Sequence, residues 1–195
     1  MRLQKGFYFD QTRCTGCQAC VVACKDWHDT PAGSARWVHI TSKEAGFFPH
    51  PTVSFLFHSC HHCAEPACVA VCPHDAIAKR GQDGIVVVRA ESCVGKEACG
   101  LCLEACFYRA PQFRPEPGNP PGGSMEKCDL CLDRWETGKR PACVDSCPAR
   151  ALDAGLLEDL AKEYQATPDA DGFVYSGELR PSIVFRRKEP SRHQS

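Results

Sequence analysis

The chain has 195 residues, a formal net charge of −1 and 16 cysteines, so cysteine makes up about 8% of the residues. Cysteine at this level decides the architecture of a protein, and the length allows one domain or two small ones. The near-neutral charge without a long basic run excludes a nucleic-acid module of the basic type. The longest apolar runs, such as residues 85–88, are far too short to cross a membrane. Residues 1–5 lead directly into an aromatic segment without an apolar stretch or twin arginines, so we expect no export signal.

The predicted elements are short and lie between the cysteines. Residues 7–10 read as a strand that enters the first cysteine loop, and residues 21–27 as the helix that leaves it. Residues 37–40 and 52–57 are typical of strands of an accessory sheet, and residues 84–88 of a third strand after a Gly-rich turn. Short helices should follow Pro66, Cys99 and Pro141.

The rest of the chain is a loop, a helix and a strand. Residues 115–123 are rich in Pro and Gly and separate the third group of cysteines from the fourth. Residues 180–188 are typical of a final strand. Apolar side chains after the last cysteine recur on one helical face, which favours core or subunit packing: Leu156, Leu157, Leu160, Ala161 and Tyr164.

The cysteines fall into four sets of four, each ending in C-x3-C, and none is left over. The first set has the spacing C-x2-C-x2-C-x3-C and consists of Cys14, Cys17, Cys20 and Cys24. The second has the spacing C-x2-C-x4-C-x3-C and consists of Cys60, Cys63, Cys68 and Cys72. The third has the spacing C-x5-C-x2-C-x3-C and consists of Cys93, Cys99, Cys102 and Cys106. The fourth has the spacing C-x2-C-x11-C-x3-C and consists of Cys128, Cys131, Cys143 and Cys147.

Disulfides, structural zinc and iron–sulfur clusters compete for these cysteines. Disulfides belong mainly to small secreted domains, and three thiols within seven residues are too crowded to bridge to separate partners. Structural zinc sites combine two C-x2-C pairs of cysteines. The first set cannot be divided into such pairs without leaving a thiol over. The full run C-x2-C-x2-C-x3-C is that of bacterial ferredoxins, in which the fourth cysteine ligates the other cluster. Four such sets predict four 4Fe–4S clusters in two ferredoxin-like pairs.

Little else in the sequence can do chemistry. Phosphate loops, nucleophile elbows and HExxH motifs are all missing, and iron should occupy the thiols. His61 and His62 lie inside the second set; packing, or a hydrogen bond to a cluster sulfur, is favoured over ligation. Basic residues near the sets would offset part of the negative charge of the clusters, although each could equally be a solvated surface charge: Lys25, Lys79, Arg80, Lys127, Arg134, Lys139 and Arg140.

The cysteine motifs and the residues between them resemble the iron–sulfur subunit of the dimethyl sulfoxide reductase family. The resemblance covers most of residues 6–160. It is carried by residues 9–17 with 23–26, by 60–63 with 65–68 and 71–73, by 83–86, and by 127–131 with 138–152. It implies an α+β fold of two ferredoxin-like cluster pairs related by pseudo-symmetry, with accessory strands and a C-terminal helix. Residues 1–50 and 124–155 would form one pair, residues 51–123 an inserted second pair, and residues 156–195 a helix and tail for subunit packing.

The resemblance also implies a nested set of ligands. One cluster would be held by Cys14, Cys17, Cys20 and Cys147, and its neighbour by Cys24, Cys128, Cys131 and Cys143. A third would be held by Cys60, Cys63, Cys68 and Cys106, and the fourth by Cys72, Cys93, Cys99 and Cys102. The spacing alone leaves open the pairing of adjacent sets instead.

The same resemblance implies a non-catalytic subunit that transfers electrons inside a larger complex. The partners would be a large subunit with a molybdenum or tungsten bis-pterin cofactor and an integral membrane anchor that exchanges electrons with quinone. The complex would be membrane-associated, on the cytoplasmic face or co-exported to the periplasm with a partner. A free-standing soluble polyferredoxin that shuttles electrons between enzymes is the alternative function, and a zinc-stapled interaction protein is a third.

The third set departs from the family pattern. Five residues separate Cys93 from Cys99 where the family has two, and Phe107 replaces a proline. Four ligands remain, so a cluster should still form. The longer loop brings Lys96 and Glu97 close and should change solvent access, two factors that act on the reduction potential; a harmless insertion is the alternative.

Overall fold

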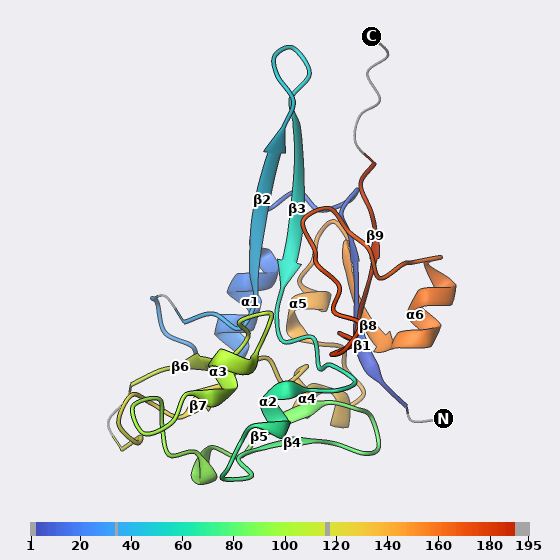
Figure 1. The fold of residues 1–195 in the computed structure, drawn as a ribbon. Helices are drawn as coiled ribbons and strands as arrows, with labels where there is room; N and C mark the ends of the chain where they lie inside the picture. Colours follow the sequence, from blue (N-terminus) through green and yellow to red (C-terminus); the bar gives the residue numbers. More distant parts are fainter. Residues whose placement is uncertain (1–2, 34, 116–117, 190–195) are drawn as a thin grey trace.

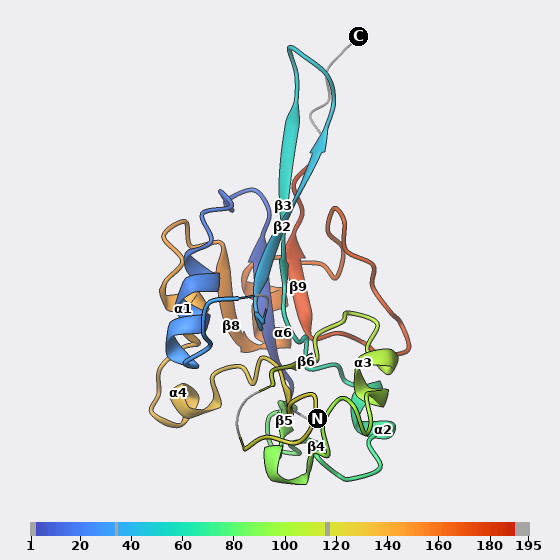
Figure 2. The same ribbon diagram turned by 90° about the vertical axis from the view of Figure 1, so that its left-hand side faces the viewer.

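The structure is a computed structural model that describes residues 3–33, 35–115 and 118–189. Its elements form a body around a three-stranded sheet, a second group of short elements at one end, and a hairpin that projects from the opposite end (Figures 1 and 2). This mixture of helices and strands confirms the predicted α+β class. In the described part of the chain no helix has both the length and the apolar character that a membrane crossing requires.

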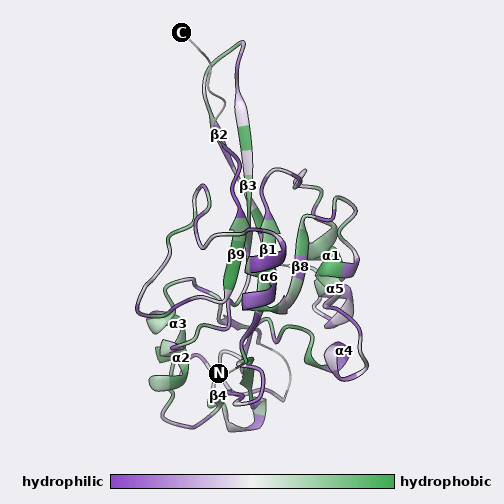
Figure 3. Ribbon diagram, turned by 90° about the vertical axis from the view of Figure 1, so that its right-hand side faces the viewer, coloured by the Kyte–Doolittle hydropathy of each residue, from purple (hydrophilic) through white to green (hydrophobic). Residues whose placement is uncertain are grey.

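The central sheet has the order β8-β1-β9. Strand β1 (Lys5–Asp10) pairs antiparallel with β8 (Leu152–Leu156) and parallel with β9 (Ile183–Arg186). Side chains alternate between the two faces of a strand, so Phe7 and Phe9 enter the main core while Tyr8 faces helix α6 (Leu157–Glu163). In Figure 3 strand β9 is mainly hydrophobic and α6 mainly hydrophilic. The strand predicted over residues 7–10 is thereby confirmed.

The C-terminal part of the chain differs in detail from its prediction. Leu156 belongs to β8 and not to the helix, which begins one residue later. The apolar repeat does continue onto α6, where Leu160 is buried, and Tyr164 directly after the helix stacks on Tyr8 with ring centroids 3.9 Å apart. The predicted final strand is confirmed, shortened to β9, and it completes the central sheet.

The projecting hairpin consists of β2 (His39–Ala45) and β3 (Thr52–His58), paired over seven residues from His39↔His58 to Ala45↔Thr52. The second of the two predicted accessory strands is confirmed. The first was placed too early, because the apolar run ends at Ile40 whereas β2 continues through polar residues. Those residues are exposed, so no alternating pattern marks them.

The elements at the other end are short. Strands β4 (Ile77–Lys79) and β5 (Val86–Val88) form one antiparallel pair, and β6 (Gln112–Phe113) and β7 (Met125–Glu126) another. Helices α2 (Ala67–Ala70) and α3 (Leu101–Ala105) pack together, and a 3-10 helix, η1 (Ala90–Ser92), precedes Cys93. The apolar core here is small and consists of Ile77, Val86, Cys102 and Met125.

Three further helices flank the central sheet. They are α1 (Ala19–Trp27), α4 (Leu132–Glu136) and α5 (Ala142–Asp145). Helix α1 packs on α5, and α5 packs on β8. The helices expected over residues 21–27 and after Pro66, Cys99 and Pro141 are therefore all present, and the strand expected over residues 84–88 is confirmed, shortened to β5. The elements β4, β6, β7, β8, α4 and η1 were not predicted.

Candidate metal centres

All 16 cysteines are free in the structure, and seven of them are buried. The thiols lie in four groups of four, each built from segments that are distant in the sequence. The disulfide interpretation therefore has no bond to support it. In the following paragraphs the groups are numbered 1 to 4.

Group 1 consists of Cys14, Cys17, Cys20 and Cys147, which line one cavity together with Phe9, Ile40 and Leu152. Burial, and then the thiols of Cys14, Cys147 and Cys17, raise the pKa of Cys20 to about 12. The loop that carries the first two thiols turns at the end of β1. There the buried Asp10 accepts hydrogen bonds from the backbone N–H of Thr12 at 2.8 Å and from its hydroxyl at 2.5 Å.

Group 2 consists of Cys24, Cys128, Cys131 and Cys143, all of them buried. Burial, followed by the thiol of Cys131, raises the pKa of Cys24 to about 12. Burial also holds the pKa values of Cys128 and Cys143 well above their ordinary range, with the thiols of the same group as further causes. The packing of α1 on α5 brings two of these thiols together across the sequence.

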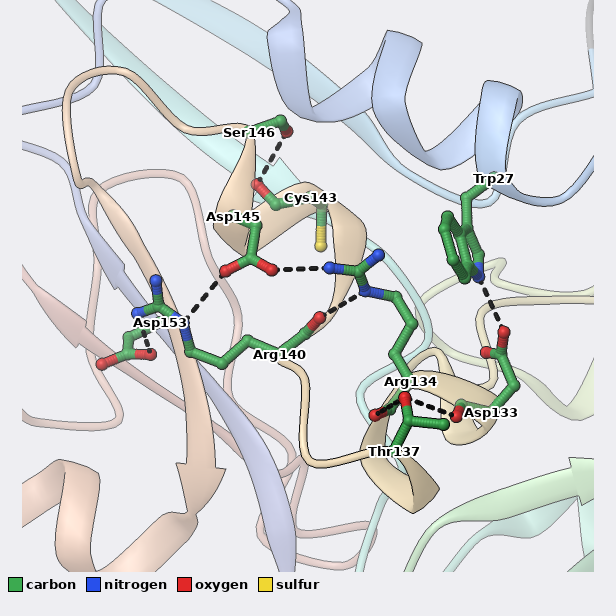
Figure 4. Close-up of polar contacts among 9 residues, drawn as sticks. All are labelled: Trp27, Asp133, Arg134, Thr137, Arg140, Cys143, Asp145, Ser146 and Asp153. Atoms are coloured by element: carbon green, nitrogen blue, oxygen red, sulfur yellow. Dashed lines mark hydrogen bonds and ion pairs between the residues drawn. The ribbon is translucent and has the colours of Figure 1, made fainter.

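The eleven residues between Cys131 and Cys143 are folded back by a polar network (Figure 4). Arg134 donates to the carbonyl oxygen of Arg140 at 2.5 Å and to the carboxylate of Asp145 at 2.6 Å. Asp145 also accepts from Arg140 at 3.1 Å, and the guanidinium of Arg134 lies 4.4 Å from the ring centroid of Trp27. These contacts hold α4 against α5 and α1. The thiols of Cys131 and Cys143 therefore lie in one group although eleven residues separate them in the sequence.

Group 3 consists of Cys60, Cys63, Cys68 and Cys106. Burial, and then the thiols of Cys60, Cys106 and Cys68, raise the pKa of Cys63 to about 12. Burial and Cys60 raise the pKa of Cys68 to about 12 as well, against the opposing charge of Lys127. The backbone N–H of Ala110 donates to the sulfur of Cys106 at 3.4 Å.

Group 4 consists of Cys72, Cys93, Cys99 and Cys102, which line a second cavity together with Ile77, Phe113 and Met125. Burial, and then the thiols of Cys93 and Cys99, raise the pKa of Cys102 to about 11. The backbone N–H of Met125 donates to the sulfur of Cys93 at 3.4 Å.

The groups are also close to one another in pairs. Cys20 of group 1 contributes to the raised pKa values of Cys24 and Cys143 in group 2. Cys102 of group 4 likewise contributes to the raised pKa of Cys68 in group 3. The C-x3-C step at the end of the first and second sets therefore spans two neighbouring groups.

The surroundings of the thiols fit a bound metal cluster. Four thiols in an apolar space resist ionisation, as their raised pKa values show, and a cation among them removes that penalty because metal ligands are thiolates. The sulfurs of Cys128 and Cys147 accept backbone N–H donors from Leu130 and Ala151 at 3.4 and 3.3 Å. Hydrogen bonds of this kind tune the potential of iron–sulfur clusters.

Comparison with known proteins decides which metal centre this is. Residues 51–157 and residues 13–77 match two protein-family profiles, each described as a 4Fe-4S dicluster domain. The sequence is 41% identical to the B chain of anaerobic dimethyl sulfoxide reductase of Escherichia coli strain K12, over 98% of this protein and 93% of that one. It belongs to this family of iron–sulfur proteins. The corresponding B chain of Haemophilus influenzae is also 41% identical, over 97% and 92%, and protein NrfC of Escherichia coli strain K12 is 38% identical, over 79% and 66%.

Membership in this family establishes the cofactor. Two dicluster domains and 16 cysteines account for four 4Fe–4S clusters, and the zinc interpretation is thereby set aside. The protein is an iron–sulfur protein of electron transfer, as the cysteine spacing predicted.

His61 and His62 are both buried, and their contacts differ. His62 accepts a hydrogen bond at Nδ1 from the backbone N–H of Val86 at 3.0 Å, which leaves its proton on Nε2. His61 makes edge-on ring contacts with Tyr108 and Phe173, with centroids 4.7 and 5.5 Å apart. Burial is the main cause that lowers the pKa of both, to about 3 for His61. Both rings are therefore neutral packing residues in the second cysteine loop.

One residue near the clusters was left without a role by the sequence. His28 follows α1, and its Nε2 lies 3.5 Å from the sulfur of Cys131 and 3.7 Å from Oδ1 of Asp129. These three side chains are close enough to hold a metal ion, but Cys131 already belongs to group 2. His28 therefore contacts a thiol of group 2. The fold creates this contact across 103 positions of sequence, so no local motif could have indicated it.

Proposed function

We propose that each of the four cysteine groups holds one 4Fe–4S cluster, in the nested arrangement given above. The proposal is supported by the thiols that act on one another's pKa values within each group, and by the two cavities that groups 1 and 4 line. Under this arrangement the protein has two halves. Residues 1–50 with 124–155 carry groups 1 and 2, and the inserted residues 51–123 carry groups 3 and 4 as a pseudo-symmetric second pair. In residues 156–195, the described part up to residue 189 adds α6 and β9 to the first half and would pack against other subunits; residues 190–195 of the predicted tail lie outside the described residues.

The ligand grouping is tested by serine substitution at cysteines that lie close in the sequence. Cys20→Ser and Cys147→Ser should alter the same reduced-state electron paramagnetic resonance (EPR) signal, because both belong to group 1. Cys24→Ser and Cys143→Ser should alter a different one. If Cys20→Ser alters the same signal as Cys72→Ser and not the signal that Cys147→Ser alters, the nested arrangement is wrong and adjacent sets pair instead.

The electron-transfer role takes a specific form in this proposal. The protein relays electrons through its four clusters between a large subunit with a molybdenum or tungsten bis-pterin cofactor and an integral membrane anchor, quinone or another acceptor. It does no substrate chemistry itself. The complex is membrane-associated, on the cytoplasmic face or co-exported to the periplasm. Support comes from the relatives, which are named as one chain of a reductase.

The surface of the projecting hairpin also supports a permanent complex. Phe47 and Phe48 lie at the turn between β2 and β3 and are 89% and 95% exposed. Adjacent, fully exposed aromatic rings at the end of a protrusion are a liability for a protein that diffuses freely, whereas a pocket on a partner subunit would bury them. The hairpin would then be a docking element of the subunit.

Native purification from the source organism tests this assembly. A large subunit that contains molybdenum or tungsten should co-purify with this protein, and the complex should contain about 16 iron and 16 sulfide from this subunit in addition to those of its partners. A lone protein of 21.4 kDa that carries all four clusters would instead favour the free polyferredoxin.

A further inference from the structure

Lys127 is a buried lysine at the junction of the two halves. It directly precedes Cys128 of group 2, and the residue is only 3% exposed. Its Nζ donates hydrogen bonds to the carbonyl oxygen of Cys128 at 3.1 Å and to the carbonyl oxygen of Val86. Since Val86 lies on β5 within residues 51–123, the ammonium group joins the backbones of both halves.

The charge of Lys127 has no carboxylate partner. Within residues 3–33, 35–115 and 118–189 no ion pair involves it, and its two acceptors are neutral carbonyl groups. The six other basic residues that the sequence singled out are all less buried. A buried ammonium group without a counter-charge is costly. An oxidised 4Fe–4S cluster with four thiolates carries a net negative charge. Clusters on both sides of Lys127 would therefore supply the counter-charge that no carboxylate provides.

The position of Lys127 relative to the cysteines shows which clusters it faces. It adjoins Cys128 of group 2 in the sequence. Its second acceptor, Val86, donates its backbone N–H to Nδ1 of His62 at 3.0 Å, and His62 lies between Cys60 and Cys63 of group 3.

We propose that Lys127 is the residue that sets the reduction potentials at the crossing between the two cluster pairs, by stabilising the reduced forms of the clusters of groups 2 and 3. The proposal rests on the ligand grouping proposed above. Transfer of an electron between these clusters oxidises one and reduces the other, without a change of bonds or protons. Each reduction adds one negative charge next to the fixed positive charge, which makes both clusters better electron acceptors. Lys127 acts through this charge and is not a ligand.

Lys127→Met removes the charge at nearly constant length, and Lys127→Gln removes it while keeping a hydrogen-bond donor. Lys188→Met is the matched control, because the Nζ of Lys188 also donates to a backbone carbonyl, that of Val53 on the accessory hairpin, at 2.7 Å. The pocket that Lys188 and Val53 line contains no cysteine. All three substitutions change the net charge by the same amount. Iron and sulfide content is measured first, followed by potentiometric titration monitored by EPR spectroscopy.

Both Lys127 variants should contain the full complement of iron and sulfide, because the role is to tune the clusters. Two of the four reduction steps should move to more negative potential by at least about tenfold in equilibrium constant, which is about 59 mV for one electron. The other two steps, and all four in Lys188→Met, should move much less. An unchanged titration, an equal shift of all four steps, or failure of Lys127→Gln to load its clusters would overturn the proposal. The serine variants described above test the ligand grouping separately, so a failure of the grouping is distinguished from a failure at Lys127.

Discussion

Substitution of Gly16 by alanine should destabilise the first cysteine loop. Gly16 lies between Cys14 and Cys17 and has a φ of +69°, in the left-handed region that favours glycine. A Cβ placed on it would lie 2.4 Å from Cε1 and 2.8 Å from Cζ of Phe55. The ring of Phe55 belongs to β3, so the loop and the hairpin would compete for the same space.

Two costs contribute to the expected effect. A non-glycine residue in the left-handed conformation costs about 1–2 kcal/mol. Forcing a methyl group against a packed ring costs about 1–3 kcal/mol, because Phe55 must leave its position. Together the two effects should lower the free energy of unfolding by about 2–5 kcal/mol. Since the strain is released in the transition state for unfolding, the rate of cluster loss should rise at least about tenfold.

The rate is measured as anaerobic loss of visible cluster absorbance in guanidinium chloride. Gly81→Ala is the control, since a methyl group on Gly81 would have no neighbour within 4 Å and its φ lies outside the left-handed region. Adding Phe55→Leu should recover part of the loss in Gly16→Ala, the part due to the clash, and leave the backbone cost. If Gly16→Ala loses its clusters no faster than Gly81→Ala, the reasoning is refuted.

Three further perturbations test the packing around the clusters. Removal of iron with a chelator should abolish the near-ultraviolet circular dichroism of the protein, because the apolar core beside the cysteines of group 4 is so small; retention of that spectrum would contradict this. Asp171→Asn should speed hydrogen exchange in the hairpin by weakening the contacts of the carboxylate with Lys43 at 2.6 Å and Ser54 at 2.7 Å. Those hydrogen bonds lower the pKa of Asp171 in the folded protein. Their stabilisation is therefore complete above the ordinary aspartate pKa near 4 and is lost only as the pH falls through the lower pKa of the folded state. The difference in exchange rate between wild type and variant should stay constant from pH 8 to pH 6. Tyr164→Phe should lower the free energy of unfolding by about 1–2 kcal/mol through loss of the 2.6 Å hydrogen bond to Asp153, without moving any reduction potential, and a shifted potential would contradict a purely structural role for this hydrogen bond.

The cysteine spacing predicted the chemistry because the ligands of a ferredoxin loop are local in the sequence. Three thiols of the first set are brought together by one turn and the start of one helix, so C-x2-C-x2-C carries nearly all the required information. The fourth ligand of each group is different. Cys147 reaches group 1 only because β8 pairs with β1, and this pairing depends on contacts more than 140 positions apart. Spacing alone therefore left the grouping open, and the family resemblance was needed to suggest it.

Strand β8 shows why some elements could not be predicted. Its sequence, Leu-Asp-Ala-Gly-Leu, contains no β-branched residue, and its last leucine continues a helical repeat with Leu157 and Leu160. Local preference therefore favoured a helix at Leu156. The strand forms because Leu152 and Ala154 cover the core beside Phe7 and Phe9, a tertiary gain that outweighs local preference.

The longer loop of the third set is covered in the structure. Its Gly95 has a φ of +88°, and a Cβ there would lie 2.4 Å from the carbonyl oxygen of Pro121, so this close approach requires glycine. The backbone N–H of Glu97 also donates to that oxygen, at 3.4 Å. The inserted residues thus pack against the Pro/Gly-rich loop, and the side chains of Lys96 and Glu97 remain exposed. Of the two effects expected from the insertion, altered access of solvent to group 4 has a direct basis in this contact. The charge effect is weak by comparison, because water screens two exposed side chains of opposite sign, whereas the buried charge of Lys127 is not screened.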